Sequence, residues 1–194
     1  MDLALDPPAA IEERRVVSEQ AAGPGAEDSR LVEDVREGSP GAFDRLYARY
    51  ARMVHGILLA RVPGRHVEDL VQEVFLTVHR RLGTLRDARA LGGWLAMIAR
   101  SRAIDHLRRW PEPEALPEDV AAPRDGRAEA AEVLDAIRAL PEAYREPLIL
   151  RLVEGMTGPE IAERTGLTPG SVRVNLHRGM LRLREALRRS HSHG

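Results

Sequence analysis

The chain has 194 residues, of which 43% are hydrophobic and 30% are charged, so we expect a globular protein of one or two small domains. It has no cysteine, which excludes disulfide bonds, thiol catalysis and cysteine-ligated zinc, and no apolar run approaches the roughly 20 residues of a membrane-spanning helix. The net charge of −1 is unevenly distributed, because all 29 basic residues are Arg and they give residues 31–110 a net charge of +5 and residues 164–194 a net charge of +6, a pattern typical of nucleic-acid binding.

Residues 1–29 are expected to form a disordered acidic tail, because prolines and glycines interrupt a weakly periodic sequence. Within this tail, a short helix is expected only around Ile11–Val17. The acidic start lacks the basic residues of a signal peptide, which favours a cytoplasmic protein. A first helix is predicted over residues 31–38. Ser39 and Pro40 then predict the start of the next helix, as its N-cap and first helical residue.

Three longer helices are predicted up to residue 110, each marked by apolar residues at spacings of three and four. No segment alternates with period two, so residues 30–110 are predicted to form an all-α bundle. The apolar positions that define its helices are Phe43, Leu46, Tyr47, Tyr50, Val54, Ile57, Leu58, Val67, Leu70, Val71, Val74, Phe75, Val78, Leu82, Trp94, Leu95, Ile98, Ile104 and Leu107.

Residues 111–127 contain prolines and five acidic residues, and they are predicted to form an extended linker. A second helical domain is expected over residues 128–189, followed by a short disordered tail at 190–194. Its first helix should turn Val133, Leu134, Ile137 and Leu140 inward, and the next should do the same with Leu148, Ile149, Leu152 and Val153. The whole chain is therefore predicted to be all-α, with two small domains joined by a flexible linker.

Residues 157–176 have the pattern of a helix-turn-helix motif. Ala162 is small where two crossing helices meet, Gly166 suits a left-handed turn, and Thr168 precedes Pro169 at the start of the second helix. A helix-turn-helix places its second helix in the major groove of DNA. The outward residues of that helix are predicted to be Ser171, Arg173, Val174, His177 and Arg178, with Arg182 further along.

Together these segments resemble a sigma factor of the extracytoplasmic-function (ECF) group of the sigma-70 family. Residues 30–110 resemble region 2, through DLVQEVFL at residues 69–76 and through WL, IAR and AIDHLRR between residues 94 and 109. Residues 128–189 resemble region 4, through LP at 140–141, EIAE at 160–163, SVR at 171–173 and HR at 177–178.

The resemblance implies a dissociable subunit that binds bacterial core RNA polymerase, through the β′ coiled coil and the β flap, and directs it to promoter DNA. It implies polymerase contacts by Asp69, Gln72 and Glu73, which share one helix face. It implies contacts to the −10 element by Arg86, Arg100, Ser101, Arg102, Asp105, Arg108 and Arg109, and to the −35 element by Ser171, Arg173, Val174, His177, Arg178 and Arg182. It also implies an anti-sigma factor that blocks these faces until a stress signal releases it.

Several positions depart from the family pattern. Ser101 stands where Asn is usual, and Val174 and Asn175 replace the usual Ser and Arg. Gly92 and Gly93 are expected to loosen a loop before Trp94, and Gly179 lies inside the recognition helix, where glycine costs about 1 kcal/mol relative to alanine.

No enzymatic chemistry is predicted, since no nucleophile has a base beside it and no glycine-rich phosphate loop is present. The seven His residues show no ligand spacing, so neither a metal nor a cofactor is expected. Two other functions fit the same pattern: a stand-alone helix-turn-helix regulator, whose N-terminal half would be a receiver or dimerisation domain, and a decoy that binds an anti-sigma factor without initiating transcription. A receiver would require alternating β-strands.

Overall fold

The computed structural model describes residues 24–110 and 127–191, and within them every regular element is a helix. The predicted all-α class is therefore confirmed, and the described N-terminal half has no strand from which a receiver could be built. The expected helix at 11–17, most of the linker, and the residues after His191 lie outside the described residues.

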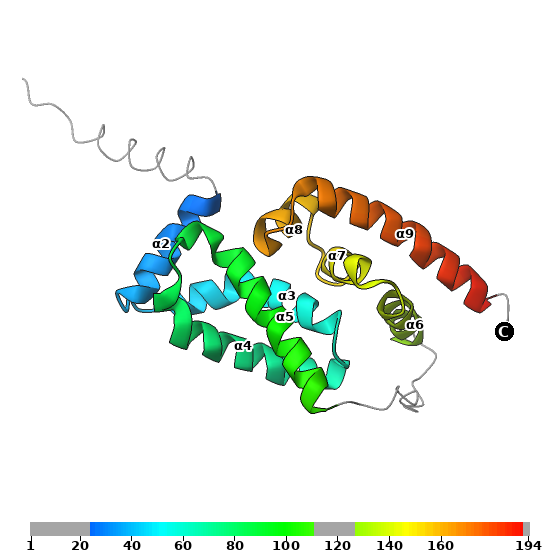
Figure 1. Ribbon diagram of the computed structural model, residues 1–194, viewed down its shortest axis with the longest axis horizontal. Helices are drawn as coiled ribbons and strands as arrows, with labels where there is room; N and C mark the ends of the chain where they lie inside the picture. Colours follow the sequence, from blue (N-terminus) through cyan, green and yellow to red (C-terminus); the bar gives the residue numbers. More distant parts are fainter. Residues whose placement is uncertain (1–23, 111–126, 192–194) are drawn as a thin grey trace, which may run out of the picture.

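The helices form two groups that lie side by side (Figure 1). The N-terminal bundle comprises α2 (Pro24–Arg36), α3 (Ala42–Leu59), α4 (Val67–Arg81) and α5 (Leu91–Arg109), with 3₁₀ turns at Gly64–His66, Leu82–Thr84 and Ala88–Ala90. The C-terminal bundle comprises α6 (Arg127–Arg138), α7 (Glu142–Leu152), α8 (Gly158–Thr165) and α9 (Pro169–His191).

The core of the N-terminal bundle is formed where α3, α4 and α5 pack against one another. Most of the predicted apolar positions are buried there, including Leu46, Tyr50, Val74 and Leu95. Phe43 and Tyr47 lie at the edge of this core, where each packs against the ring of Phe75. Ile104 and Leu107 are exposed, so their apolar character does not mark the buried face of α5.

The first described helix begins earlier than predicted. Helix α2 starts at Pro24, so the expectation that residues 24–29 belong to a disordered tail is wrong. The reason is a long-range contact, because the Asp28 carboxylate accepts hydrogen bonds from the Tyr50 hydroxyl at 2.6 Å and from Nε of Arg49 at 2.9 Å. Asp28 is only 4% exposed.

The predicted cap at Ser39 is also wrong. Helix α3 begins at Ala42, with Gly41 as its N-cap at φ 70°. The backbone of Ser39 instead takes part in the C-terminal cap of α2. Its N–H donates to the carbonyl of Asp34, and the N–H of Gly38, which has φ 73°, donates to the carbonyl of Val35. This is the Schellman arrangement, in which Ser39 is the second residue after the C-cap Glu37 of α2.

The helix-turn-helix of the C-terminal bundle forms as predicted. Thr157 and Glu160 make a reciprocal capping box at the start of α8, Gly166 ends α8 at φ 73°, and the Thr168 hydroxyl accepts from the N–H of Ser171. Ile161, Ala162 and Val172 are buried. In α7, Leu148 and Ile149 are buried as expected, whereas Leu152 and Val153 are exposed because the helix ends there.

Gly179 has a packing role inside α9. A Cβ atom at this position would lie 3.0 Å from Cδ1 of Leu148 and 3.2 Å from Cβ of Tyr144. The glycine therefore allows α9 to approach α7 closely, which offsets its unfavourable helix propensity.

Candidate nucleic-acid and partner interfaces

The acidic face of α4 projects into solvent. Asp69, Gln72 and Glu73 are exposed, whereas their neighbours Leu70, Val71, Val74 and Phe75 are buried in the bundle. Leu76 follows on the same exposed side with 56% of its surface accessible. An exposed Leu bordered by carboxylates suits a partner surface that combines basic and apolar groups.

The residues predicted to contact the −10 element lie mostly on the exposed side of α5. Arg86, Ser101, Arg108 and Arg109 are exposed, and Arg102 and Asp105 are half-buried. Arg102 donates to the hydroxyl of Thr77 at 3.0 Å and lies 3.9 Å from the Glu73 carboxylate. The predicted polymerase and −10 surfaces therefore adjoin along α4 and α5.

An apolar strip that sequence analysis missed accompanies these arginines. Ile104, Leu107 and Trp110 are exposed, with 65% of the Trp110 surface accessible. Ile104 and Leu107 lie three residues apart on one side of α5, and Trp110 follows directly after the last residue of this helix. Exposed aromatic rings beside guanidinium groups are suited to stacking with unpaired bases. The sequence itself indicates that Trp110 is not a core residue, because the helix cannot continue through the proline that follows it at position 111.

Arg100 does not join this exposed set. Its Nε and Nη2 atoms lie 3.0 Å and 2.6 Å from the two carboxylate oxygens of Glu146, on α7 of the other bundle. This hydrogen bonding raises the pKa of Arg100 above its ordinary value. The structure thus separates Arg100 from the other residues of the predicted −10 set.

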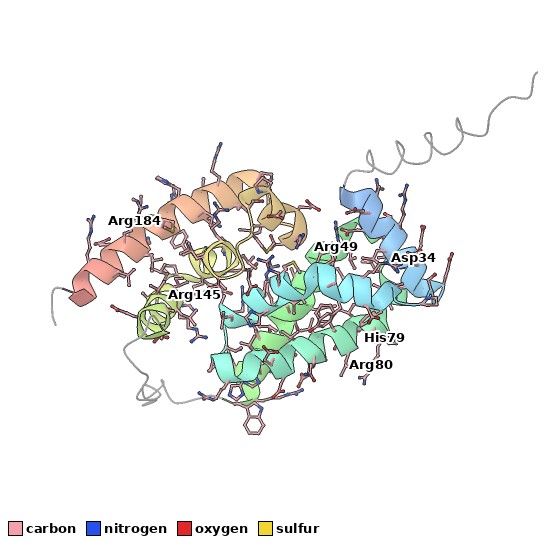
Figure 2. The ribbon with its side chains drawn as sticks, turned by 180° about the vertical axis from the view of Figure 1, so that it is seen from behind. Asp34, Arg49, His79, Arg80, Arg145 and Arg184 are labelled. Atoms are coloured by element: carbon pink, nitrogen blue, oxygen red, sulfur yellow. The ribbon has the colours of Figure 1, made fainter. Side chains whose placement is uncertain are left out.

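The exposed side of α9 carries the residues predicted to read the −35 element. Ser171, Arg173, Val174, His177, Arg178 and Arg182 are all exposed. The guanidinium of Arg182 also lies over the ring of Tyr144, 5.6 Å from its centre. Figure 2 shows Arg184 directed away from the body of the protein on the same helix. The structure therefore brings the six residues together on one element.

Gly92 and Gly93 lie in the first turn of α5, so the expected loosening of a loop before Trp94 is wrong. Gly92 is buried against the backbone of Arg164 in α8. The glycines allow two helices of different bundles to approach, which no local pattern in the sequence reveals.

Polar contacts across the boundary between the bundles were also missed. His55 Nδ1 lies 2.6 Å from a carboxylate oxygen of Glu154, and the main effect of this hydrogen bond is to raise the pKa of His55. Arg49, labelled in Figure 2, donates to Asp28 in its own bundle and lies 3.7 Å from Glu163 of α8. His55 and Glu154 are 99 residues apart in sequence, and Glu163 is even farther from Arg49, so sequence spacing gives no signal of these contacts.

In the part of the chain that the structure describes, no group of three or more His, Asp or Glu side chains is arranged to hold a metal ion. Among the same residues, no helix combines the length and apolar character required to cross a membrane.

Comparison with known proteins assigns both bundles. Residues 46–110 match the family model of sigma-70 region 2, and residues 130–183 match that of sigma-70 region 4. The RNA polymerase sigma factor CarQ of Myxococcus xanthus is 36% identical over 165 residues, covering 80% of this chain and 95% of that protein. The ECF RNA polymerase sigma-E factor of Haemophilus influenzae is 32% identical over 170 residues, covering 78% and 90%.

A solved structure of CnrH in complex with the cytosolic domain of CnrY shares the fold, with a TM-score of 0.59, 26% identity, and coverage of 82% of this chain and 96% of that chain. The two region models match in the order region 2, region 4, and the relatives are matched along most of their length. Both findings assign the chain to one family. The chain belongs to the extracytoplasmic-function sigma factors of the sigma-70 family, which are non-enzymatic initiation factors of transcription.

Proposed function

We propose that this sigma factor binds core RNA polymerase through the α4 face formed by Asp69, Gln72, Glu73 and Leu76. The observation that carries the proposal is that these four residues are exposed on a helix whose other side is packed into the bundle core. Carboxylates grouped around an exposed leucine complement a basic partner surface with an apolar centre. The β′ coiled coil is the partner that the family resemblance implies.

The promoter is bound by the two arginine-rich surfaces. The exposed end of α5, with Arg108, Arg109 and Trp110, engages the opened −10 strand by phosphate neutralisation and base stacking. Helix α9 enters the major groove at the −35 element, where Arg173 and Arg178 can reach base edges and phosphates. The polymerase performs the chemistry, and this chain selects the promoter and helps to separate the DNA strands.

Regulation by an anti-sigma factor is part of the proposal. The structurally similar protein CnrH was solved in a complex with the cytosolic domain of CnrY, which supports a protein partner for this chain. Because its polymerase and promoter are cytoplasmic, we place the site of action in the cytoplasm. With no cysteine in the chain, a thiol signal must be sensed by another protein.

The polymerase contact is tested by charge reversal. Asp69→Arg and Glu73→Arg should each weaken co-elution with purified core polymerase, because a basic partner then meets a like charge. The matched control is Glu37→Arg, an exposed charge reversal that follows α2 and does not lie on the Asp69–Glu73 face of α4. Undiminished co-elution of both α4 variants would contradict the assignment of this face.

Run-off transcription separates this function from the alternatives. A sigma factor directs specific transcripts from a genomic promoter library when it is added to core polymerase. A stand-alone regulator or a decoy adds none, even when the protein is folded and no inhibitor is present. The same experiment identifies the promoter sequence.

A further inference from the structure

The connection between α4 and α5 carries Arg86, which is predicted to contact the −10 element. We call residues 82–90 the α4–α5 loop. The side chains of Leu82 and Leu85 are buried, whereas Arg86 and Arg89 are exposed. A segment with so few buried side chains has little hydrophobic anchoring of its own. Its conformation therefore depends on polar contacts with the elements beside it.

Helix α2 supplies these contacts. In its last turn, Nη2 of Arg36 donates to the carbonyl of Leu82 at 3.2 Å and also to the carbonyl of Leu85. Both hydrogen atoms of one guanidinium nitrogen are thus used on backbone groups of the α4–α5 loop. Hydrogen bonds from a charged donor are stronger than those between neutral groups. Helix α2 also packs against both 3₁₀ turns of the loop, and Figure 1 shows it beside the connection from α4 to α5.

The contact with Leu85 bears directly on Arg86. The carbonyl of Leu85 and the N–H of Arg86 belong to one peptide group, and this group is planar. A donor that holds the carbonyl therefore also fixes the plane from which the backbone of Arg86 departs. At this point the chain passes from a buried leucine to an exposed arginine. The anchor thus lies at the residue before the predicted DNA contact.

The second half of the loop is held by its own polar groups and by the other end of α2. The Asp87 carboxylate accepts from the N–H of Arg89 at 3.0 Å, and the Asp87 carbonyl accepts from the N–H of Ala90 at 3.0 Å. A Cβ atom on Gly25, near the start of α2, would lie 3.3 Å from Cγ of Arg89. Helix α2 therefore contacts the loop at both of its ends, with Arg36 as the polar anchor.

We propose that Arg36 is a positioning residue for recognition of the −10 element: it holds the carbonyls of Leu82 and Leu85, and so fixes the place from which Arg86 reaches the opened strand. The proposal rests on the proposed function for the binding of that strand. Helix α2 precedes residues 46–110, which match sigma-70 region 2, so the family match assigns it no role. Arg36 acts through Arg86, because its own Nη2 hydrogens are directed at the loop.

The test removes the anchor and compares it with a matched arginine. Arg36→Met keeps an unbranched apolar side chain and removes both hydrogen bonds to the loop. The control is Arg45→Met in α3, which removes the same charge and also breaks a contact with α2. Arg45 makes an exposed ion pair with Asp34 at 2.7 Å, and this pair does not involve the loop. Urea unfolding by circular dichroism shows whether either change affects the whole fold.

Limited trypsin digestion reports the loop itself. Trypsin cleaves after arginine, so Arg86 is a probe that the loop already contains. In Arg36→Met, cleavage after Arg86 should become severalfold faster, because a released loop opens more often to the protease. In Arg45→Met it should match the parent chain. Cleavage after Arg178 in α9, followed by mass spectrometry in the same samples, is the internal reference.

Transcription shows whether the anchor acts through Arg86. With core polymerase limiting in the run-off assay on the promoter library, Arg36→Met should lower the specific transcript about tenfold. This is the change expected if the competent loop conformation falls from nearly all of the population to about a tenth. In an Arg86→Ala background, Arg36→Met should have little further effect, because the two residues act on one contact. A direct DNA contact by Arg36, or a role in overall stability alone, would instead add its full effect in both backgrounds.

The outcomes separate this proposal from the proposed function. Equal cleavage after Arg86 in the parent chain and in Arg36→Met would overturn the anchor, and so would full additivity of Arg36→Met with Arg86→Ala, even though the parent chain still directs transcription. A parent chain that directs no specific transcript would reject the proposed function, whereas faster cleavage in Arg36→Met would still support the anchored loop. If Arg36→Met does not fold, Arg36→Gln, with a shorter neutral side chain, decides the result in the same two assays.

Discussion

Replacing Asp28 by alanine should reveal that α2 is an integral part of the N-terminal bundle. The Asp28 carboxylate joins α2 to α3 by accepting from the Tyr50 hydroxyl at 2.6 Å and from Arg49 at 2.9 Å. Burial and the neighbouring carboxylate raise the pKa of Tyr50 well above its ordinary value, so the hydroxyl stays protonated and donates. In Asp28→Ala, a Tyr side chain that is only 1% exposed loses its acceptor.

The size of the effect follows from these contacts. A hydrogen bond to a charged group contributes about 1.5–3 kcal/mol. The Arg49 contact adds less, because its side chain is 24% exposed and it keeps an ion pair with Glu27 at 2.8 Å. We therefore expect Asp28→Ala to lower the free energy of unfolding by about 2–3 kcal/mol, which moves the urea midpoint by about 1 M for a typical urea dependence.

Urea unfolding followed by circular dichroism measures this shift. Tyr50→Phe should cost less in the Asp28→Ala background than in the parent chain, because the donor and acceptor form one pair. Asp34→Ala is the matched control, since the same residue type on the same helix makes an exposed ion pair with Arg45 and should cost under about 1 kcal/mol. Equal midpoint shifts for Asp28→Ala and Asp34→Ala would refute the buried linkage.

Three further results are expected. The hydrogen bond to Glu154 raises the pKa of His55 above 6.5, so its contribution to the free energy of unfolding is fully present below pH 6.5 and is lost as the pH rises through the raised value. The urea midpoint should fall as the pH rises, and it should change less in His55→Gln; the other charged side chains facing this pair are Arg52, 3.9 Å from Glu154, and Glu68. Thr157→Ala removes the capping box of α8 and should lower stability by about 1 kcal/mol in urea unfolding, whereas an unchanged midpoint would deny the cap a role. Arg178→Ala should reduce the slope of log affinity against log salt for −35 duplex DNA by about 1, and an unaltered slope would remove Arg178 from the phosphate contacts.

Local chemistry explains which parts of the fold could be predicted from the sequence. The helix-turn-helix was recognisable because Thr157, Gly166 and Thr168 each act within a few residues of their own backbone. The buried face of α4 was recognisable because its apolar residues repeat with the helical period. Both signals are complete within a single element.

Contacts between distant segments account for what was missed. In the sequence, Asp28 looks like one more charge of an acidic tail. Only the fold shows that it accepts a hydrogen bond from Tyr50, 22 residues away. Glu146 also looks like an ordinary charged residue in the sequence, although the fold buries it between Arg61 and Arg100. Gly92 reads as a loop signal, because nothing near it in the sequence indicates the backbone of Arg164.

The interface glycines offer a way to sort relatives by sequence alone. At Gly92 only a hydrogen atom fits against the backbone of Arg164 in α8, whereas at Gly56 a Cβ atom would meet side-chain atoms of Leu150 and Glu154, which can shift. A homologue with a bulkier residue at the position of Gly92 must therefore hold its two bundles farther apart than this chain does.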